Sequence, residues 1–119
     1  MENNVPQYKD LEVVRKTTKN YELQFTKNGQ MVDITDYSVY FTVKTNMNDN
    51  DASSVINKTV TSHSEPTKGI TLIQLTTSDT DIDAGNYYYS IDYKDDDDNQ
   101  QVLFTGRIRV IEPVRKTRA

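Results

Sequence analysis

The chain has 119 residues and a formal net charge of −4, and 34% of its residues are hydrophobic. This length suits one domain, and no apolar run approaches the ~20 residues that a membrane-spanning helix needs. The acidic balance argues against nucleic acid as the main partner, because phosphate binding needs a surplus of Lys and Arg. The absence of Cys excludes disulfides, thiolate nucleophiles and Cys-ligated zinc.

The types of residue favour β-structure. The sequence contains 15 Thr, 11 Val, 8 Ile and 8 Tyr against 5 Leu and 3 Ala. Thr, Val, Ile and Tyr fit a pleated, half-buried surface, whereas Ala and Leu favour helices. The first residues lack the basic-then-apolar order of a secretory signal, which predicts folding in a cytosol.

The first half of the chain predicts an arm followed by three strands. Residues 1–9 are polar and contain a proline, so we expect a flexible N-terminal arm. Strands are expected at residues 11–15, 21–25 and 39–44, since apolar and polar residues alternate in the last two. Residues 27–30 form a predicted turn, with an Asn-Gly pair that tolerates positive φ.

The middle of the chain is more polar. Residues 46–54 predict an exposed loop, and residues 55–60 a weak strand. Residues 70–77 are strongly β-forming but ambiguous in phase. We expect Ile73 and Leu75 to point inward.

Two long strands are expected near the C-terminus, after a short helical turn at residues 78–81. The strand at residues 85–94 and the strand at 101–111 each carry an apolar face, made by Tyr87, Tyr89, Ile91 and Tyr93 in the first and by Val102, Phe104, Ile108 and Val110 in the second. Gly106 interrupts the second strand, where we expect a close approach of another backbone rather than a bulge.

Together these elements predict an all-β fold of about seven antiparallel strands in two sheets. We expect the sandwich to cover residues 10–112, between the arm of residues 1–9 and a basic tail at 113–119.

One segment identifies the type of sandwich. Residues 83–89, Asp-Ala-Gly-Asn-Tyr-Tyr-Tyr, resemble the opening of the sixth strand of immunoglobulin-like domains. In such a tyrosine corner, a Tyr hydroxyl bonds back to upstream backbone while its ring fills the core. The resemblance assigns this role to Tyr87, with Asp83 and Gly85 forming the turn before it. The alternative interpretation is an aromatic run on the surface.

A narrower resemblance covers residues 17–116. The chain is similar to the N-terminal immunoglobulin-like domain of phage upper baseplate proteins and related tail or head-fibre proteins. The matching motifs occur in order, at residues 33–35 (Asp-Ile-Thr), 69 (Gly), 75–80 (Leu-Thr-Thr-Ser-Asp-Thr), 85–89 (Gly-Asn-Tyr-Tyr-Tyr), 106–110 (Gly-Arg-Ile-Arg-Val) and 113–115 (Pro-Val-Arg).

The resemblance implies a structural component of a bacteriophage virion, placed in the tail, the baseplate or a head decoration or fibre attachment. Its expected partners are other virion proteins, in multiple copies on a symmetric particle. It implies no cofactor and no enzymatic activity. Family members usually continue into coiled-coil or receptor-binding modules, whereas this sequence ends at Ala119.

Two chemical alternatives compete with this structural role. His63 is the sole His and lies between two Ser residues in the loop at 62–68, where a solvated side chain is the simplest interpretation and no nucleophile motif supports catalysis. Asp79, Asp81 and Asp83 alternate and are weak candidates for calcium, but they lack the Gly and Glu positions of an EF-hand loop.

Interface residues are expected on the outward faces of the strands and in the tail. If Tyr87 and Tyr89 point inward, Tyr88 points outward, and Tyr40 does likewise on the third strand. The tail adds three cations, Arg115, Lys116 and Arg118. The alternative function is a carbohydrate- or cell-surface-binding module, with calcium dependence as one variant of it, since outward Tyr side chains also serve sugar sites.

Overall fold

The computed structural model describes residues 7–46 and 54–113 of the chain. The described part forms ten strands, of which seven have four residues or more. The strands are β1 (Gln7–Tyr8), β2 (Leu11–Val14), β3 (Lys19–Gln24), β4 (Thr26–Lys27), β5 (Gln30–Met31), β6 (Ser38–Lys44), β7 (Ile56–Val60), β8 (Ile70–Leu75), β9 (Gly85–Lys94) and β10 (Gln100–Ile111). A 3-10 helix, η2 (Pro66–Lys68), precedes β8. No described helix is long and apolar enough to cross a membrane.

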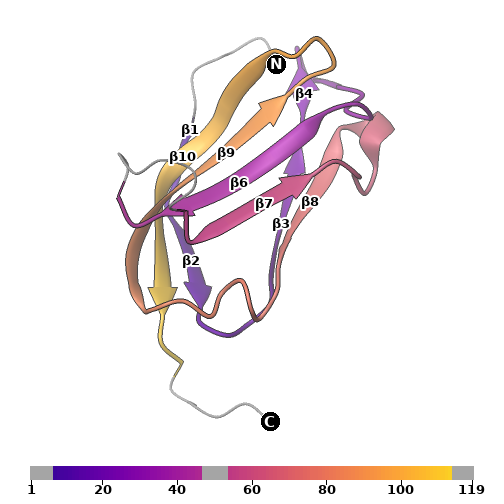
Figure 1. Cartoon of the computed structure of the whole chain (residues 1–119). Coiled ribbons are helices and arrows are strands. Elements are labelled where there is room, and N and C mark those ends of the chain that lie inside the picture. The colour runs from indigo at the N-terminus through magenta and orange to yellow at the C-terminus, as the bar shows by residue number, and fades with distance from the viewer. Residues whose placement is uncertain (1–6, 47–53, 114–119) are drawn as a thin grey trace.

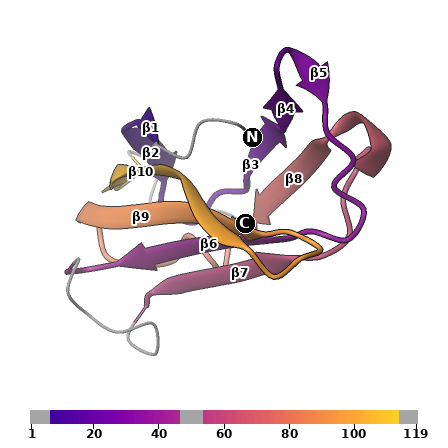
Figure 2. The same ribbon diagram turned by 90° about the horizontal axis from the view of Figure 1, so that it is seen from above.

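The strands form two layers (Figures 1 and 2). The larger sheet has the order β1-β10-β9-β6-β7, with β2 also paired to β10, and the smaller layer pairs β3 with β8. A short hairpin of β4 and β5 extends from β3. Its turn contains Asn28 and Gly29 with φ of 54° and 76°, which confirms the predicted turn.

The division of strands is that of an immunoglobulin-like sandwich. In such domains the third, sixth and seventh strands share one sheet, while the second and fifth are neighbours in the other. Here β6, β9 and β10 are adjacent in the larger sheet, and β3 pairs with β8. The predicted fold class is confirmed. One detail differs, because β1 and β2 run parallel to β10 rather than antiparallel.

The core lies between the layers and follows the predicted alternation. In β6, Val39, Phe41 and Val43 are fully buried, and in β8 Ile73 and Leu75 are fully buried, as expected. Aromatic rings fill one end of the core, where Phe25 packs edge-on against both Tyr37 and Tyr93. Sixteen residues make up the buried apolar cluster of the described chain: Val13, Phe25, Ile34, Val39, Phe41, Val43, Ile56, Ile73, Leu75, Tyr87, Tyr89, Ile91, Tyr93, Leu103, Ile108 and Val110.

A bulge in β10 changes which of its residues point inward. The pairing with β9 skips one residue between Val102 and Phe104, so Leu103 is the extra residue. Val102, predicted in the core, pairs with Asp92 and is 36% exposed, whereas Leu103 is only 8% exposed. That prediction is wrong because an inserted residue reverses the parity of a strand on one side of it.

The N-terminal arm is shorter than predicted. Gln7 and Tyr8 pair with Phe104 and Thr105, and the Lys9 amide donates to the Thr105 carbonyl oxygen at 3.0 Å, so residues 7–9 belong to the sheet. Gly106 has φ of 157°, and a Cβ there would collide with the Lys9 carbonyl group. The expected close backbone approach at this glycine is confirmed.

Candidate functional site

The outer face of the larger sheet is the side turned away from β3 and β8. Its side chains come from alternate positions of three adjacent strands, as the half-buried or exposed residues between the core positions show. We call this surface the outer face; it consists of Tyr40, Thr42 and Lys44 on β6, Tyr88, Ser90 and Asp92 on β9, and Thr105 and Arg107 on β10.

A tyrosine flanked by two cations crosses the outer face. Lys44 on β6 is in register with Tyr88 on β9, and Tyr88 is in register with Arg107 on β10. Directly opposed residues lie about 4.5–5.5 Å apart at Cβ, so the three side chains are neighbours. Lys44 and Tyr88 are half-buried and Arg107 is exposed. The row presents an aromatic ring with positive charge on both sides.

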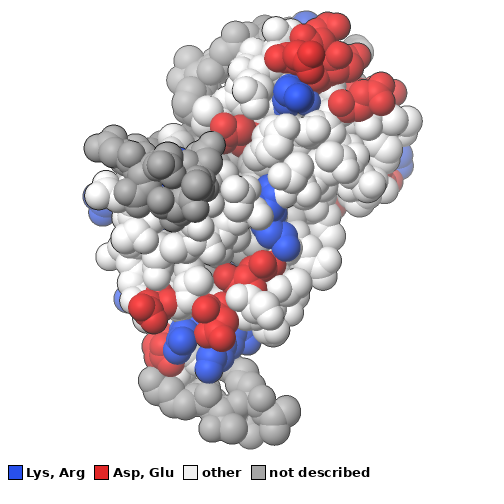
Figure 3. All heavy atoms as spheres, viewed as in Figure 1, with Lys and Arg blue, Asp and Glu red and all other residues white. Residues whose placement is uncertain are grey.

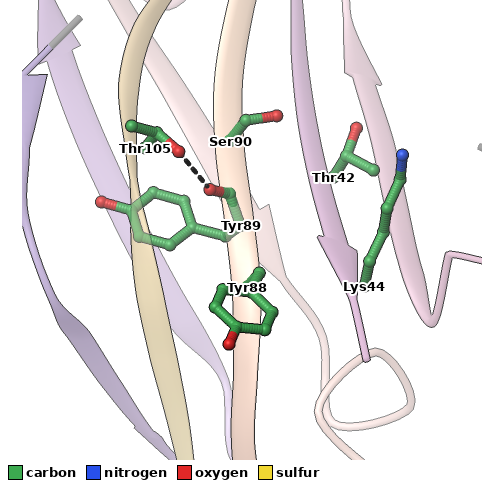
Figure 4. Close-up of a pocket in the computed structure, with 6 residues that line it drawn as sticks. All are labelled: Thr42, Lys44, Tyr88, Tyr89, Ser90 and Thr105. Atoms are coloured by element: carbon green, nitrogen blue, oxygen red, sulfur yellow. Dashed lines mark hydrogen bonds between the residues drawn. The ribbon is translucent and has the colours of Figure 1, made fainter. Parts of the chain in front are cut away.

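The next row is made of hydroxyl groups. Thr42, Ser90 and Thr105 are in register across the same three strands. With Lys44 and Tyr88 of the first row they line a shallow hollow of about 110 Å³, in which Figure 4 shows the Tyr88 ring below Ser90. The Thr105 hydroxyl donates to the Tyr89 carbonyl oxygen at 3.3 Å. The hollow therefore combines an aromatic ring, hydroxyl groups and one lysine.

Tyr40 lies on the outer face but away from Tyr88. Tyr40 pairs with Asp92, four positions along β9 from Tyr88. Four residues of a strand span about 13 Å. The two predicted interface tyrosines therefore share a face without sharing a site.

The predicted corner residues lie together at the start of β9. The Tyr87 hydroxyl donates to the Asp83 carbonyl oxygen at 2.6 Å, and the Tyr87 ring is 8% exposed. Gly85 begins the strand with φ of 148°. Burial, together with the nearby Asp83 carboxylate, raises the pKa of Tyr87. A neutral phenol thus closes the turn and joins the core.

The three weak calcium candidates have separate roles. Asp79 accepts from the Thr76 amide at 2.8 Å and pairs with Lys58 at 2.9 Å. Asp81 pairs with Arg15 at 3.1 Å, and Asp83 uses its carbonyl oxygen for Tyr87. Within the residues that the structure describes, no group of three or more His, Asp or Glu is placed to hold a metal ion.

Thr76 and Asp79 form a reciprocal cap at the predicted helical turn. The Asp79 carboxylate accepts from the Thr76 amide, and the Asp79 amide donates to the Thr76 hydroxyl at 3.2 Å. Partial burial raises the pKa of Asp79, but hydrogen bonds from Thr76 and Lys58 outweigh it, so the net pKa is lowered. Through its ion pair with Lys58, the Asp79 carboxylate also links the turn to β7.

His63 was expected to be solvated, and this expectation is wrong. The half-buried ring bridges two elements, with Nε2 at 2.8 Å from the Tyr37 carbonyl oxygen and Nδ1 at 2.8 Å from the Thr71 hydroxyl. A carbonyl oxygen only accepts, so Nε2 donates to Tyr37, and Nδ1 and the Thr71 hydroxyl share the second hydrogen bond. The loop position did not predict this role, because the partners lie 8 and 26 residues away in sequence.

Acidic side chains gather at one end of the molecule, around the turn between β9 and β10 (Figure 3). Asp33 and Asp36 join Asp96 around a hollow of about 150 Å³ there. The Asp95 carboxylate caps the turn by accepting from the amides of Asp97 and Asn99, both at 2.9 Å. Hydrogen bonds from Asn99 lower the pKa of Asp95.

The other predicted interface residues, Arg115, Lys116 and Arg118, lie outside the described residues. Lys44 and Arg107 were not singled out from the sequence. Their place beside Tyr88 depends on the registers of β6 and β10 with β9, which join residues 44 and 19 positions apart and which the pattern of one strand does not reveal.

Comparison with known proteins gives distant structural neighbours only. No protein-family model and no curated protein matches the chain. The PmoD soluble domain from Methylocystis sp. ATCC 49242 has a TM-score of 0.49 at 9% identity, covering 83% of this chain and 76% of its own. A chain from a study of multimeric cell-adhesive interactions of VGSC beta subunits has a TM-score of 0.42 at 14% identity, covering 93% and 98%.

Proposed function

We propose that this chain is a non-catalytic docking module that holds neighbouring proteins together in a bacteriophage particle. The observation that carries the proposal is the row Lys44–Tyr88–Arg107 on the outer face. Tyr and Arg are enriched at the centres of protein interfaces, where a rigid aromatic ring supplies contact area at little entropic cost. The virion setting rests on the order of motifs shared with phage immunoglobulin-like domains.

The chemistry of the row also describes the partner surface. Lys44 and Arg107 flank an aromatic ring, so a complementary surface carries carboxylates around an apolar or aromatic centre. Many copies on a symmetric particle make weak individual contacts sufficient, because each bound module raises the effective concentration of the next.

The proposal is tested by complementation. The gene for the chain is deleted from the phage that encodes it, and the chain is supplied in trans. Purified particles should contain the wild-type chain, while Tyr88→Ala and the double change Lys44→Glu with Arg107→Glu should reduce incorporation at least tenfold. Lys27→Glu, an exposed cation on β4, is the matched control and should incorporate normally. Particles that never contain the wild-type chain would contradict the proposal.

A carbohydrate-binding role is the second candidate, favoured by the hydroxyl row Thr42–Ser90–Thr105 beside the Tyr88 ring. Aromatic faces and hydroxyl groups together suit a sugar ring. Titration of the full chain with neutral oligosaccharides, followed by amide shifts around Tyr88, distinguishes the two. The docking proposal expects no saturable amide shift with a Kd below ~1 mM, which corresponds to a binding free energy of about −4 kcal/mol.

A further inference from the structure

A second surface lies at the side of the sandwich where the larger sheet ends at β2 and the smaller ends at β3. Figure 2 shows β3 between β8 and β2. A groove of about 130 Å³ opens there. Its walls are half-buried apolar side chains and its base is formed by core residues; the six are Leu11, Tyr21, Leu23 and Phe104 in the walls, and Tyr89 and Ile91 at the base.

The backbone of β3 presents hydrogen-bonding groups toward this groove. In the described chain β3 pairs only with β8. The amide and the carbonyl group of Ile70 both bond to Glu65, at 3.0 and 3.1 Å, so they face away from β3. Gln24, which lies opposite Ile70 on β3, is therefore in a non-hydrogen-bonded pair and directs its own peptide groups away from β8. Since the pairing alternates along an antiparallel ladder, Asn20 and Glu22 do the same. Three residues of β3 thus offer amide and carbonyl groups at an open edge.

The Tyr21 hydroxyl provides an independent observation. It is enclosed by protein and has no hydrogen-bond partner among the described residues. Burial raises the pKa of Tyr21, so the phenol stays neutral and is able to donate or accept. An enclosed hydroxyl without a partner is unfavourable, and a backbone or side-chain group entering the groove would satisfy it.

The rim of the groove indicates the charge of its occupant. Lys9 and Glu22 line it, and the Lys19 ammonium lies 5.6 Å from the centre of the Tyr21 ring. Two lysines against one glutamate favour a segment that carries carboxylates. The whole chain is acidic, with a net charge of −4, but this edge is not.

We propose that the groove binds an extended segment of a partner protein, which adds to β3 as a further strand. The segment carries apolar side chains at every second position, to enter between Leu23 and Phe104, and acidic residues at its ends, to meet Lys9 and Lys19. It spans about six residues, the length of β3, with three side chains inward. This site is separate from the outer face, so either proposal stands if the other fails.

The test uses the full chain labelled with ¹⁵N and the peptide Asp-Asp-Val-Thr-Val-Thr-Val-Asp-Asp as probe. We expect saturable shifts of the amides of Asn20, Glu22 and Gln24, with Tyr88 unchanged. The same peptide N-methylated at all five of its Val and Thr residues cannot pair with a strand edge in either direction, and should bind at least tenfold more weakly. No saturable shift at β3, or equal binding of the methylated peptide, would overturn the proposal.

Variants separate the groove from general effects on folding. Leu23→Lys should weaken peptide binding at least tenfold, whereas Leu72→Lys, on the solvent side of the partner strand and 37% exposed in the native protein, should not. Glu22→Pro removes one edge amide and should also block binding. Glu22→Ala keeps the amide and should bind the acidic peptide at least as tightly as the native chain does, because it removes the one acidic side chain of the rim. If the shifts at β3 instead follow the concentration of the chain alone, the occupant is a second copy and the proposal is wrong.

Discussion

The hydroxyl of Tyr87 donates a 2.6 Å hydrogen bond to the carbonyl oxygen of Asp83, four residues upstream. This bond satisfies the one polar atom of a ring that lies in the core. It also fixes the turn from which β9 starts, and β9 carries the Tyr88 ring of the outer face in the next position. The corner therefore sets the direction in which Tyr88 points.

Replacing Tyr87 by Phe removes this bond and leaves the ring in place. We expect the free energy of unfolding to fall by about 1–2 kcal/mol, since the Asp83 carbonyl loses its partner. Urea unfolding followed by circular dichroism measures the loss. Tyr88→Phe, on the outward side of the same strand, is the control and should change stability by less than about 0.5 kcal/mol. Equal effects of the two changes would mean that the corner bond does not stabilise the fold.

Gly106 is the position at which the N-terminal residues approach β10. A Cβ at residue 106 collides with the Lys9 backbone, whereas a Cβ at Gly29 meets nothing within 4 Å. Gly106→Ala should cost more than about 2 kcal/mol, from strain and from displacement of residues 7–9. Gly29→Ala, which also has positive φ, should cost about 1 kcal/mol. Hydrogen exchange at the Lys9 amide should speed up only in the Gly106 variant.

His63 joins its loop to two other elements. His63→Ala leaves the buried Thr71 hydroxyl and the Tyr37 carbonyl oxygen without their partner. We expect a loss of about 1–3 kcal/mol in the free energy of unfolding. Ser62→Ala, an exposed neighbour, serves as the control and should lie within about 0.5 kcal/mol of the wild type. If His63→Ala left the free energy of unfolding unchanged, His63 would again be interpreted as a solvated loop residue.

Asp79 makes the free energy of unfolding depend on pH in the acidic range. Its pKa is lower in the folded chain than its ordinary value of 3.8, so the folded state is favoured above that value. This contribution is lost as the pH falls through the folded pKa. Asp79→Asn should therefore reduce stability near neutral pH and flatten its decline below about pH 5. Lys58→Met should flatten the decline partly, since it removes the cation and leaves the carboxyl group. An unchanged decline in both variants would contradict the assignment.

Alternation within single strands made much of the fold predictable. The inward phase of β6 followed from its apolar positions, and the Gly106 approach followed from one glycine in a long strand. In β8 both phases contain apolar residues, and the preferred phase, with Ile73 and Leu75 inward, is confirmed. The segment around Asp83 and Tyr87 indicated the immunoglobulin-like type. These features are local, because each depends on residues that are neighbours in sequence.

The remaining features depend on contacts between distant segments. No residue pattern in the sequence indicates the bulge at Leu103, so the outward direction of the Val102 side chain could not be predicted. The parallel pairing of β2 with β10 and the hydrogen bond from His63 to the Tyr37 carbonyl oxygen are likewise long-range. The outer row required the register of β6, β9 and β10 together, which explains why Tyr88 was expected to point outward while Lys44 and Arg107 were not recognised.

The proposed docking role in a phage particle is tested most directly by electron cryomicroscopy of purified particles. We expect the sandwich in symmetric copies, with Tyr88, Lys44 and Arg107 covered by a neighbouring protein whose contacting surface carries carboxylates. Particles that lack the chain, or copies whose outer face is bare while another surface makes the contacts, would contradict it.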